Sequence, residues 1–303
     1  MVHQSRALVK ASLETQLAEF LGCRWVTLYP TFIEALYALQ ESVLSAPVSR
    51  QIVAICDERS EQYSLLNSIL GSYPVDRVLR VDPALEWRAA TVDEVRPDLL
   101  WWESVPYPKI SWEGVESSIG MFPEAPIRVV DATMSPLAIQ LVDTDYCLLS
   151  DMRGIVGHAN ISCAALVGVS RRAGSAPFGD AVSGSSLSAV KEAIPTARQR
   201  ESTRIRNAME VEAYFGVQNF LGRIRRPNTE RAAWIIEIKS GPVVGMRQLN
   251  SELFDQVLGL DTSSLVVVKD SVSSSGVADL ILSVGLERPE DVIGELNRLF
   301  QGS

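Results

Sequence analysis

Hydrophobic residues follow two different periods in the first half of the chain. Between residues 8 and 21 they recur at helical spacing, which predicts a helix ending at Gly22, and a second helix is predicted over 32–44. Runs rich in β-branched and other apolar residues then predict strands at 51–56, 76–81, 98–102, 127–131, 145–149 and 163–169. Several of these runs lack polar alternation, as strands buried on both faces of a parallel sheet do. With a further helix predicted over 61–70, the order indicates a three-layer α/β fold with a mainly parallel sheet.

The second half of the chain predicts a separate, smaller α/β unit. Residues 171–200 are rich in Gly, Ser and Ala, which predicts a linker. The elements expected after it are helices near 202–221, 246–258 and 289–300 and strands at 232–239, 264–268 and 279–284. We therefore expect a large domain over 1–200, with the linker at its end, and a small C-terminal domain over 201–303.

Charge and composition exclude several classes of function. The 303 residues carry 28 Lys and Arg against 37 Asp and Glu, a net charge of −9, which disfavours nucleic-acid and membrane-surface partners. The N-terminus lacks the apolar segment of a signal peptide, and no apolar run approaches the ~20 residues that span a bilayer, so we expect a cytoplasmic protein. Four scattered cysteines and two histidines predict no metal site.

Five strings along the chain carry a family resemblance. They are LETQLAEFLG, WWESVPYP, RVVDATMSP, CLLSDMRGIVGHANISCAALVG and LILSVGLERPEDVIGEL. In this order they resemble the cystathionine γ-synthase-like (Cys/Met metabolism) family of pyridoxal-phosphate (PLP) enzymes. The resemblance implies the fold type I, aminotransferase-like architecture with a smaller C-terminal domain. It also implies a homo- or hetero-oligomer, because sites of this fold are assembled at a subunit interface.

The chain departs from the family at the positions that hold the cofactor. Where the family has the lysine that forms an imine with PLP, SDMRG places Arg153, whose guanidinium stays protonated and is a poor nucleophile. The family's stacking tyrosine falls near Arg59, its asparagine becomes Tyr107, and its carboxylate-binding arginine becomes Ile281. The glycine-containing phosphate turn becomes YPTF, in which Pro30 has no N–H. We therefore expect a degenerate member with no cofactor, or with PLP only if it is bound non-covalently.

A few polar residues match the family pattern. Asp131 matches the acid that pairs with the pyridine nitrogen, although an aspartate after a strand also caps turns. Ser150 is a further vestige of the cofactor site, and His158 is either a structural hydrogen-bonding group or a base. Because doubly wound sheets bind ligands at the carboxyl ends of their strands, Glu103, Asp131, Arg153 and His158 are the residues expected to line a pocket, and the candidate catalytic groups.

Two main classes of function remain open from the sequence, beside a third in which pyridoxal phosphate or pyridoxamine phosphate stays bound without a covalent link and His158 is the base. The first is a non-catalytic subunit, scaffold or regulator of a biosynthetic partner, such as an active paralogue. The alternative is a PLP-independent enzyme or a binder of a small anion, with Arg153, Tyr107 and Arg59 as the anion contacts. The partner of Arg153 separates these readings: an ion pair with Asp131 or Glu103 would make it a structural plug.

Overall fold

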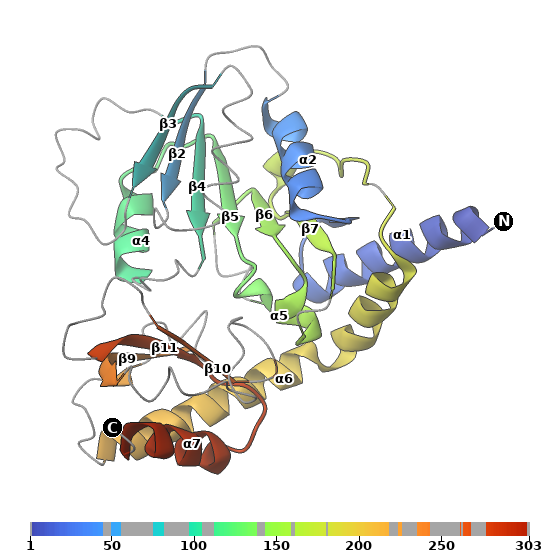
Figure 1. Ribbon diagram of the computed structural model, residues 1–303. Helices are drawn as coiled ribbons and strands as arrows, with labels where there is room; N and C mark the ends of the chain where they lie inside the picture. The colour runs from blue at the N-terminus through green and yellow to red at the C-terminus, as the bar shows by residue number, and fades with distance from the viewer. Residues whose placement is uncertain are drawn as a thin grey trace. The chain divides into compact units, whose positions relative to one another are not determined.

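The structure is a computed structural model that describes residues 2–44, 50–55, 75–81, 97–104, 112–137, 143–158, 161–179, 181–217, 224–225, 235–242, 261, 263–267 and 277–301. The chain divides into two compact units (Figure 1). The first comprises Met1–Val156 and Asn160–Ile194, and the second comprises Gly157–Ala159 and Pro195–Ser303.

A seven-stranded sheet forms the centre of the first unit. Its strands are β1 (Trp25–Tyr29), β2 (Arg50–Ile55), β3 (Val75–Val81), β4 (Leu99–Glu103), β5 (Ile127–Asp131), β6 (Tyr146–Leu149) and β7 (Ala164–Gly168). Their order across the sheet is β1-β7-β6-β5-β4-β2-β3. The pairs β3–β2, β2–β4, β4–β5 and β5–β6 are parallel, whereas β7 pairs antiparallel with both β6 and β1. All six strands predicted for this domain are present, and β1 is a strand that the sequence interpretation missed.

Both faces of this sheet are buried, which confirms the predicted three-layer architecture. Helix α2 (Phe32–Leu44) packs against β1, β6 and β7, and its apolar residues share one cluster with Leu99, Trp101 and Val129. The alternate residues Leu100, Trp102 and Val130, which point to the opposite face, are also fully buried. Continuous apolar strands are therefore required here, because a polar residue on either face would lie in a core.

Helix ends in the first unit follow from local sequence. Helix α1 (Val2–Leu21) ends at Gly22, whose φ of 67° is the left-handed conformation that favours glycine. Helix α2 begins with a capping box: the Thr31 N–H donates to Glu34 Oε2 (2.9 Å) and the Glu34 N–H donates to Thr31 Oγ1 (3.3 Å). The first unit also contains the short helices α4 (Trp112–Gly120) and α5 (Arg153–Val156) and the 3₁₀ turn η3 (Arg171–Ala173). The helix predicted over 61–70 lies outside the described residues.

The predicted linker over 171–200 is wrong for most of its length. Residues Gly184–Val217 form one helix, α6, of 34 residues. The Ser-rich run is its N-terminal cap, where the Ser186 N–H donates to Ser183 Oγ (3.1 Å). Beyond the cap, Leu187, Val190, Ala193 and Ala197 are buried at helical spacing. Apolar residues at helical spacing were therefore present in a segment whose composition indicated a linker.

The second unit contains a four-stranded antiparallel sheet with the order β10-β11-β9-β8. Its strands are β8 (Ile224–Arg225), β9 (Ile235–Pro242), β10 (Ser264–Val267) and β11 (Val277–Ser283), and α7 spans Pro289–Gln301. The three strands predicted here and the last helix are confirmed, whereas the helix near 246–258 lies outside the described residues. Gly157 has a φ of 89°, and an added Cβ would come within 2.0 Å of the Asp261 carboxylate, so this position requires glycine.

Candidate functional site

The carboxyl ends of β4, β5 and β6 bring several predicted site residues together in the first unit. Glu103 ends β4 and Asp131 ends β5, and the two are direct neighbours in the parallel register. Both side chains are buried. Ser150 follows the last residue of β6, which is the next strand of the sheet. The predicted crevice residues of this unit thus share one edge of the sheet, as the strand order requires.

Asp131 has one satisfied and one open carboxylate oxygen. Its Oδ1 accepts the Thr133 N–H at 2.9 Å, an Asx turn of the kind that follows many strands. Its Oδ2 is buried and has no hydrogen-bond partner among the residues that the structure describes. Burial raises the pKa of Asp131 from 3.8 to about 6, against hydrogen bonding from Thr133, which lowers the pKa. A buried carboxylate oxygen without a donor is costly, and such an atom is expected where a ligand supplies the donor.

Hydroxyl groups link the strand ends around Asp131. The Thr133 hydroxyl donates to Ser150 Oγ (2.8 Å) and accepts the Ser150 N–H (2.7 Å). The Ser135 hydroxyl donates to Ser104 Oγ (2.8 Å), and the Ser104 N–H donates to the Asp131 carbonyl (2.8 Å). Sequence reasoning missed Thr133, Ser104 and Ser135. The signal available was the Asp-Ala-Thr string at a strand end, which is typical of an Asx turn.

Arg153 pairs with Asp151. Its Nε donates to Asp151 Oδ2 at 2.6 Å, its Nη2 forms an ion pair with the same oxygen, and its N–H donates to Oδ1 at 2.9 Å. The ion pair with Asp131 or Glu103 that would have made Arg153 a structural plug is therefore not the pairing found, because Asp151, two residues earlier in the chain, binds the guanidinium. Asp151 raises the pKa of Asp131 and Arg153 lowers it, so the charges of this pair act on Asp131.

The remaining predicted site residues belong to the second unit or lie outside the described residues. His158 is exposed and belongs to the second unit. Arg59 and Tyr107 lie outside the described residues. Ile281 is a buried residue of β11, opposite Val266 and Glu237.

Solved structures identify the fold, although no family model and no curated protein matches the sequence. A putative O-acetylhomoserine (thiol)-lyase from Campylobacter jejuni superimposes with a TM-score of 0.75 over 97% of this chain and 86% of its own, at 13% identity. Cystathionine γ-synthase from Xanthomonas oryzae pv. oryzae superimposes with a TM-score of 0.75 over 98% of this chain and 87% of its own, at 16% identity. An apo methionine γ-lyase from Micromonospora echinospora superimposes with a TM-score of 0.70 over 97% of this chain and 86% of its own, at 20% identity.

The chain has the fold type I architecture of these PLP enzymes. The resemblance inferred from the sequence is thereby confirmed for the fold. The expectation of no cofactor, or of PLP only in non-covalent form, is wrong by the same finding, because the C. jejuni protein of this fold carries N′-pyridoxyl-lysine-5′-monophosphate. The expectation rested on the replacements at Arg59, Tyr107, Arg153, Ile281 and the YPTF turn, whereas Asp131, which matches the acid that pairs with the pyridine nitrogen, is present.

The described residues of this fold type I chain fit one part of PLP and not another. Asp131 fits the ring nitrogen, because a protonated pyridine N–H is the donor that its open, buried Oδ2 lacks. Arg153 does not fit the covalent link, since a guanidinium does not form the imine that a lysine forms. Among the lysines, Lys10 donates to the Gly179 carbonyl (3.0 Å) and pairs with Glu14 (3.2 Å). The side chains of Lys109, Lys239 and Lys269 lie outside the described structure.

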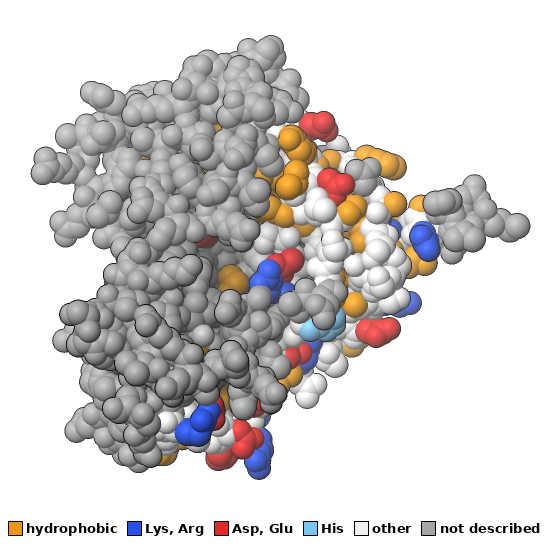
Figure 2. All heavy atoms as spheres, viewed as in Figure 1, with side chains coloured by type: hydrophobic (Ala, Val, Ile, Leu, Met, Phe, Trp, Pro, Cys, Tyr) orange, Lys and Arg blue, Asp and Glu red, His pale blue; other side chains and the backbone are white. Residues whose placement is uncertain are grey.

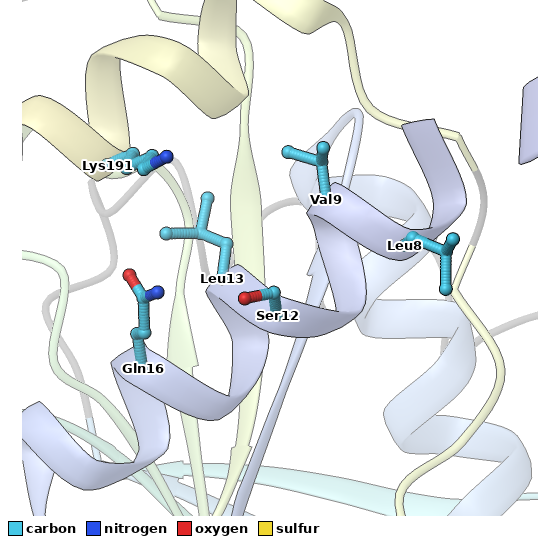
Figure 3. A pocket seen from close by; sticks show the side chains of 6 residues that line it. All are labelled: Leu8, Val9, Ser12, Leu13, Gln16 and Lys191. Carbon is cyan, nitrogen blue, oxygen red and sulfur yellow. The ribbon is translucent and has the colours of Figure 1, made fainter. Parts of the chain in front are cut away.

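A shallow groove between α1 and α6 holds the fifth lysine, Lys191. The groove has a volume of about 230 Å³, and Figure 3 shows Leu8, Val9 and Leu13 of α1 along it, with Lys191 across from them on α6. No residue predicted for the site lines it. Because its lining pairs no base with a nucleophile, the groove is not a place where we expect chemistry.

No group of three or more His, Cys, Asp or Glu side chains is placed to hold a metal ion in the described part of the chain. Among the helices that the structure describes, none is both long and apolar enough to cross a membrane.

The raised pKa of Asp131 predicts a specific dependence of stability on pH. A carboxyl with a folded pKa of about 6 and an unfolded pKa of 3.8 contributes stability that is complete below the unfolded value and lost as pH rises through the folded value. The shift corresponds to about 3 kcal/mol. We expect the free energy of unfolding of the wild type, relative to Asp131→Asn, to fall by up to this amount between acid and neutral pH. Urea unfolding of both proteins across that range measures it, and parallel pH profiles would contradict the assignment.

Proposed function

We propose that the protein binds PLP at the Asp131 edge of its sheet and acts as a non-catalytic subunit of a biosynthetic partner. The open Oδ2 of Asp131 carries the proposal: it is a buried anion at the carboxyl edge of a parallel sheet, ionised above a pH of about 6 and without a donor of its own. The fold supports the choice of ligand, because the structural relatives are PLP enzymes.

Asp131 binds and orients the ring in this proposal. Its carboxylate accepts the proton on the ring nitrogen, and Thr133 holds the other carboxylate oxygen so that Oδ2 stays available. A bound PLP ring supplies an electron sink for bonds at an attached carbon. Using that sink requires an amine that joins the cofactor and then moves a proton, which in this fold is the work of a lysine.

Arg153 is the reason for proposing a non-catalytic role. It is the first residue of α5, in the string after β6 that resembles the family's lysine segment, and Asp151 holds its guanidinium through two nitrogens. A protonated guanidinium bound to a carboxylate neither attacks an aldehyde nor accepts a proton at neutral pH. The same pairing weakens the anion-binding alternative, because an incoming anion would first have to displace Asp151.

The partner of the proposed subunit stays a prediction, as does a cytoplasmic location. Exposed apolar side chains support an oligomer: Ile33 and Tyr37 on α2 are each close to half exposed, and Figure 2 shows apolar side chains gathered over this helix. Phe178 is 97% exposed. Large apolar side chains left in water are a common feature of surfaces that bind another chain.

A turnover assay tests the non-catalytic role. Purified protein saturated with PLP is incubated with O-acetylhomoserine or cystathionine, the compounds named for its structural relatives. We expect product to form at the rate given by free PLP in the same buffer. Saturable turnover above that background, abolished by Asp131→Asn, would show an enzyme and overturn this part of the proposal.

A further inference from the structure

Thr133 occupies the junction between the two strand ends that carry Asp131 and Ser150. It is 5% exposed and makes three hydrogen bonds, one to Asp131 and two to Ser150. The N–H donates to Asp131 Oδ1 and the hydroxyl joins Ser150, while hydrogen bonding from the side chain and from the main chain of Thr133 both lower the pKa of Asp131.

We infer that Thr133 is a positioning residue, whose hydroxyl fastens the end of β5 to the end of β6 and so holds Asp131 with Oδ1 satisfied and Oδ2 open. This inference deepens the proposed function and rests on it only for the identity of the ligand. The geometry stands without a ligand, because the three hydrogen bonds and the open Oδ2 belong to the protein alone.

The hydroxyl is the part of Thr133 that does this work. The N–H bond to Oδ1 would survive any substitution other than proline, but only while the turn keeps its place. The hydroxyl accepts the Ser150 N–H at 2.7 Å, so replacing it by a methyl group would leave a main-chain donor beside the turn without its acceptor. The turn would then be free to move relative to β6.

The effect of Thr133 on Asp131 can be measured as a change in the pKa of the Asp131 carboxyl. Hydrogen bonding from Thr133 lowers the pKa of Asp131, against the larger effect of burial. The other groups acting on this carboxyl are Asp151, which raises the pKa, and Arg153, which lowers it. Glu103 is its neighbour in the sheet on β4, and the thiol of Cys147 on β6 also interacts with it electrostatically. None of these four groups changes when Thr133 is substituted, so a shift reports on the Thr133 hydroxyl, which acts on Asp131 directly and holds the strand end through Ser150.

Carbon-13 NMR of the Asp131 carboxyl in the ligand-free protein tests the inference. We expect Thr133→Val, which keeps the side-chain shape and removes the hydroxyl, to raise the pKa above the wild-type value of about 6. Thr133→Ser, which keeps the hydroxyl, should restore the wild-type value. Ser150→Ala is the matched control, because it removes the other hydroxyl but leaves the Ser150 N–H on Thr133, and it should not raise the pKa. An unchanged pKa in Thr133→Val, or an equal rise in Ser150→Ala, would overturn the inference.

PLP titration of the same variants separates this inference from the proposed function. If both hold, Thr133→Val weakens PLP binding about tenfold, the size expected for a misplaced hydrogen bond to a charged group, and Thr133→Ser does not. If the wild type fails to bind PLP, the proposed function fails, and the NMR result alone decides the role of Thr133. Circular dichroism at the temperature of measurement confirms that each variant is folded. If Thr133→Val does not fold, Thr133→Ser still tests the inference, because its Asp131 should keep the wild-type pKa.

Discussion

Asp131→Asn is expected to weaken PLP binding by about 10- to 100-fold. A hydrogen bond between a protonated ring nitrogen and a buried carboxylate contributes about 1.5–3 kcal/mol, and the amide offers a neutral atom in its place. The loss should be largest at neutral pH, where Asp131 is ionised, and should shrink as pH falls below about 6 and the wild-type carboxyl becomes protonated. Quenching of protein fluorescence during PLP titration measures both affinities across the pH range.

Asp143→Asn is the matched control for this substitution. It makes the same chemical change on the same unit, at a carboxylate that is 91% exposed and paired with Arg128. We expect PLP affinity to change by less than about twofold, because an exposed ion pair contributes little. If both variants bind PLP as the wild type does, the ring nitrogen is not held by Asp131 and the site proposed here is wrong.

Arg153→Lys is expected to allow a covalent link to PLP at residue 153, where the wild type has no amine. A lysine amine loses its proton far more readily than a guanidinium and attacks an aldehyde when neutral, so borohydride should trap a PLP adduct on residue 153. The trapped fraction should rise toward alkaline pH, because Asp151 would hold the ammonium form as it holds the guanidinium. Mass spectrometry of the reduced protein and of its peptides measures the extent and the position.

Arg153→Gln is the control that separates the effect of adding an amine at residue 153 from the effect of removing the guanidinium charge. It removes the pairing with Asp151 and supplies no nucleophile, so it should give no adduct on residue 153. Were Arg153→Lys to bind PLP tightly and still give no adduct, residue 153 would not lie beside the cofactor's aldehyde, and the match between SDMRG and the family's lysine segment would be incorrect.

The fold was largely predictable from the apolar pattern. Strands β2 to β7 were found because a sheet buried on both faces needs apolar residues on both, and α7 because Pro289, Glu290 and Asp291 are typical of a helix start. The strand β1 was missed because WVTLY lies between two helices and pairs with β7, which is far away in the sequence. The error at 184–200 came from reading composition where the buried spacing of Leu187, Val190 and Ala193 was the stronger signal.

The acidic residues of the candidate site could be predicted from the sequence, whereas the contacts between its side chains could not. Asp131 and Glu103 could be placed at one edge because each ends a parallel strand. The pairing of Arg153 with Asp151 could not be placed, since a cation near several carboxylates has several partners open to it until the turn geometry is known. Thr133 was overlooked because its role depends on the distance between two strand ends, and no sequence pattern reports that distance.

Titration of the wild-type protein with PLP, followed by borohydride reduction and intact-mass analysis, tests the central claim most directly. The account predicts saturable binding of one PLP for each chain at neutral pH and no adduct on residue 153 after reduction, because Asp131 holds the ring and the Arg153 guanidinium forms no imine. Absence of saturable binding would contradict the PLP site. A stoichiometric adduct on any of the five lysines would instead restore a lysine-linked PLP enzyme and contradict the non-catalytic role.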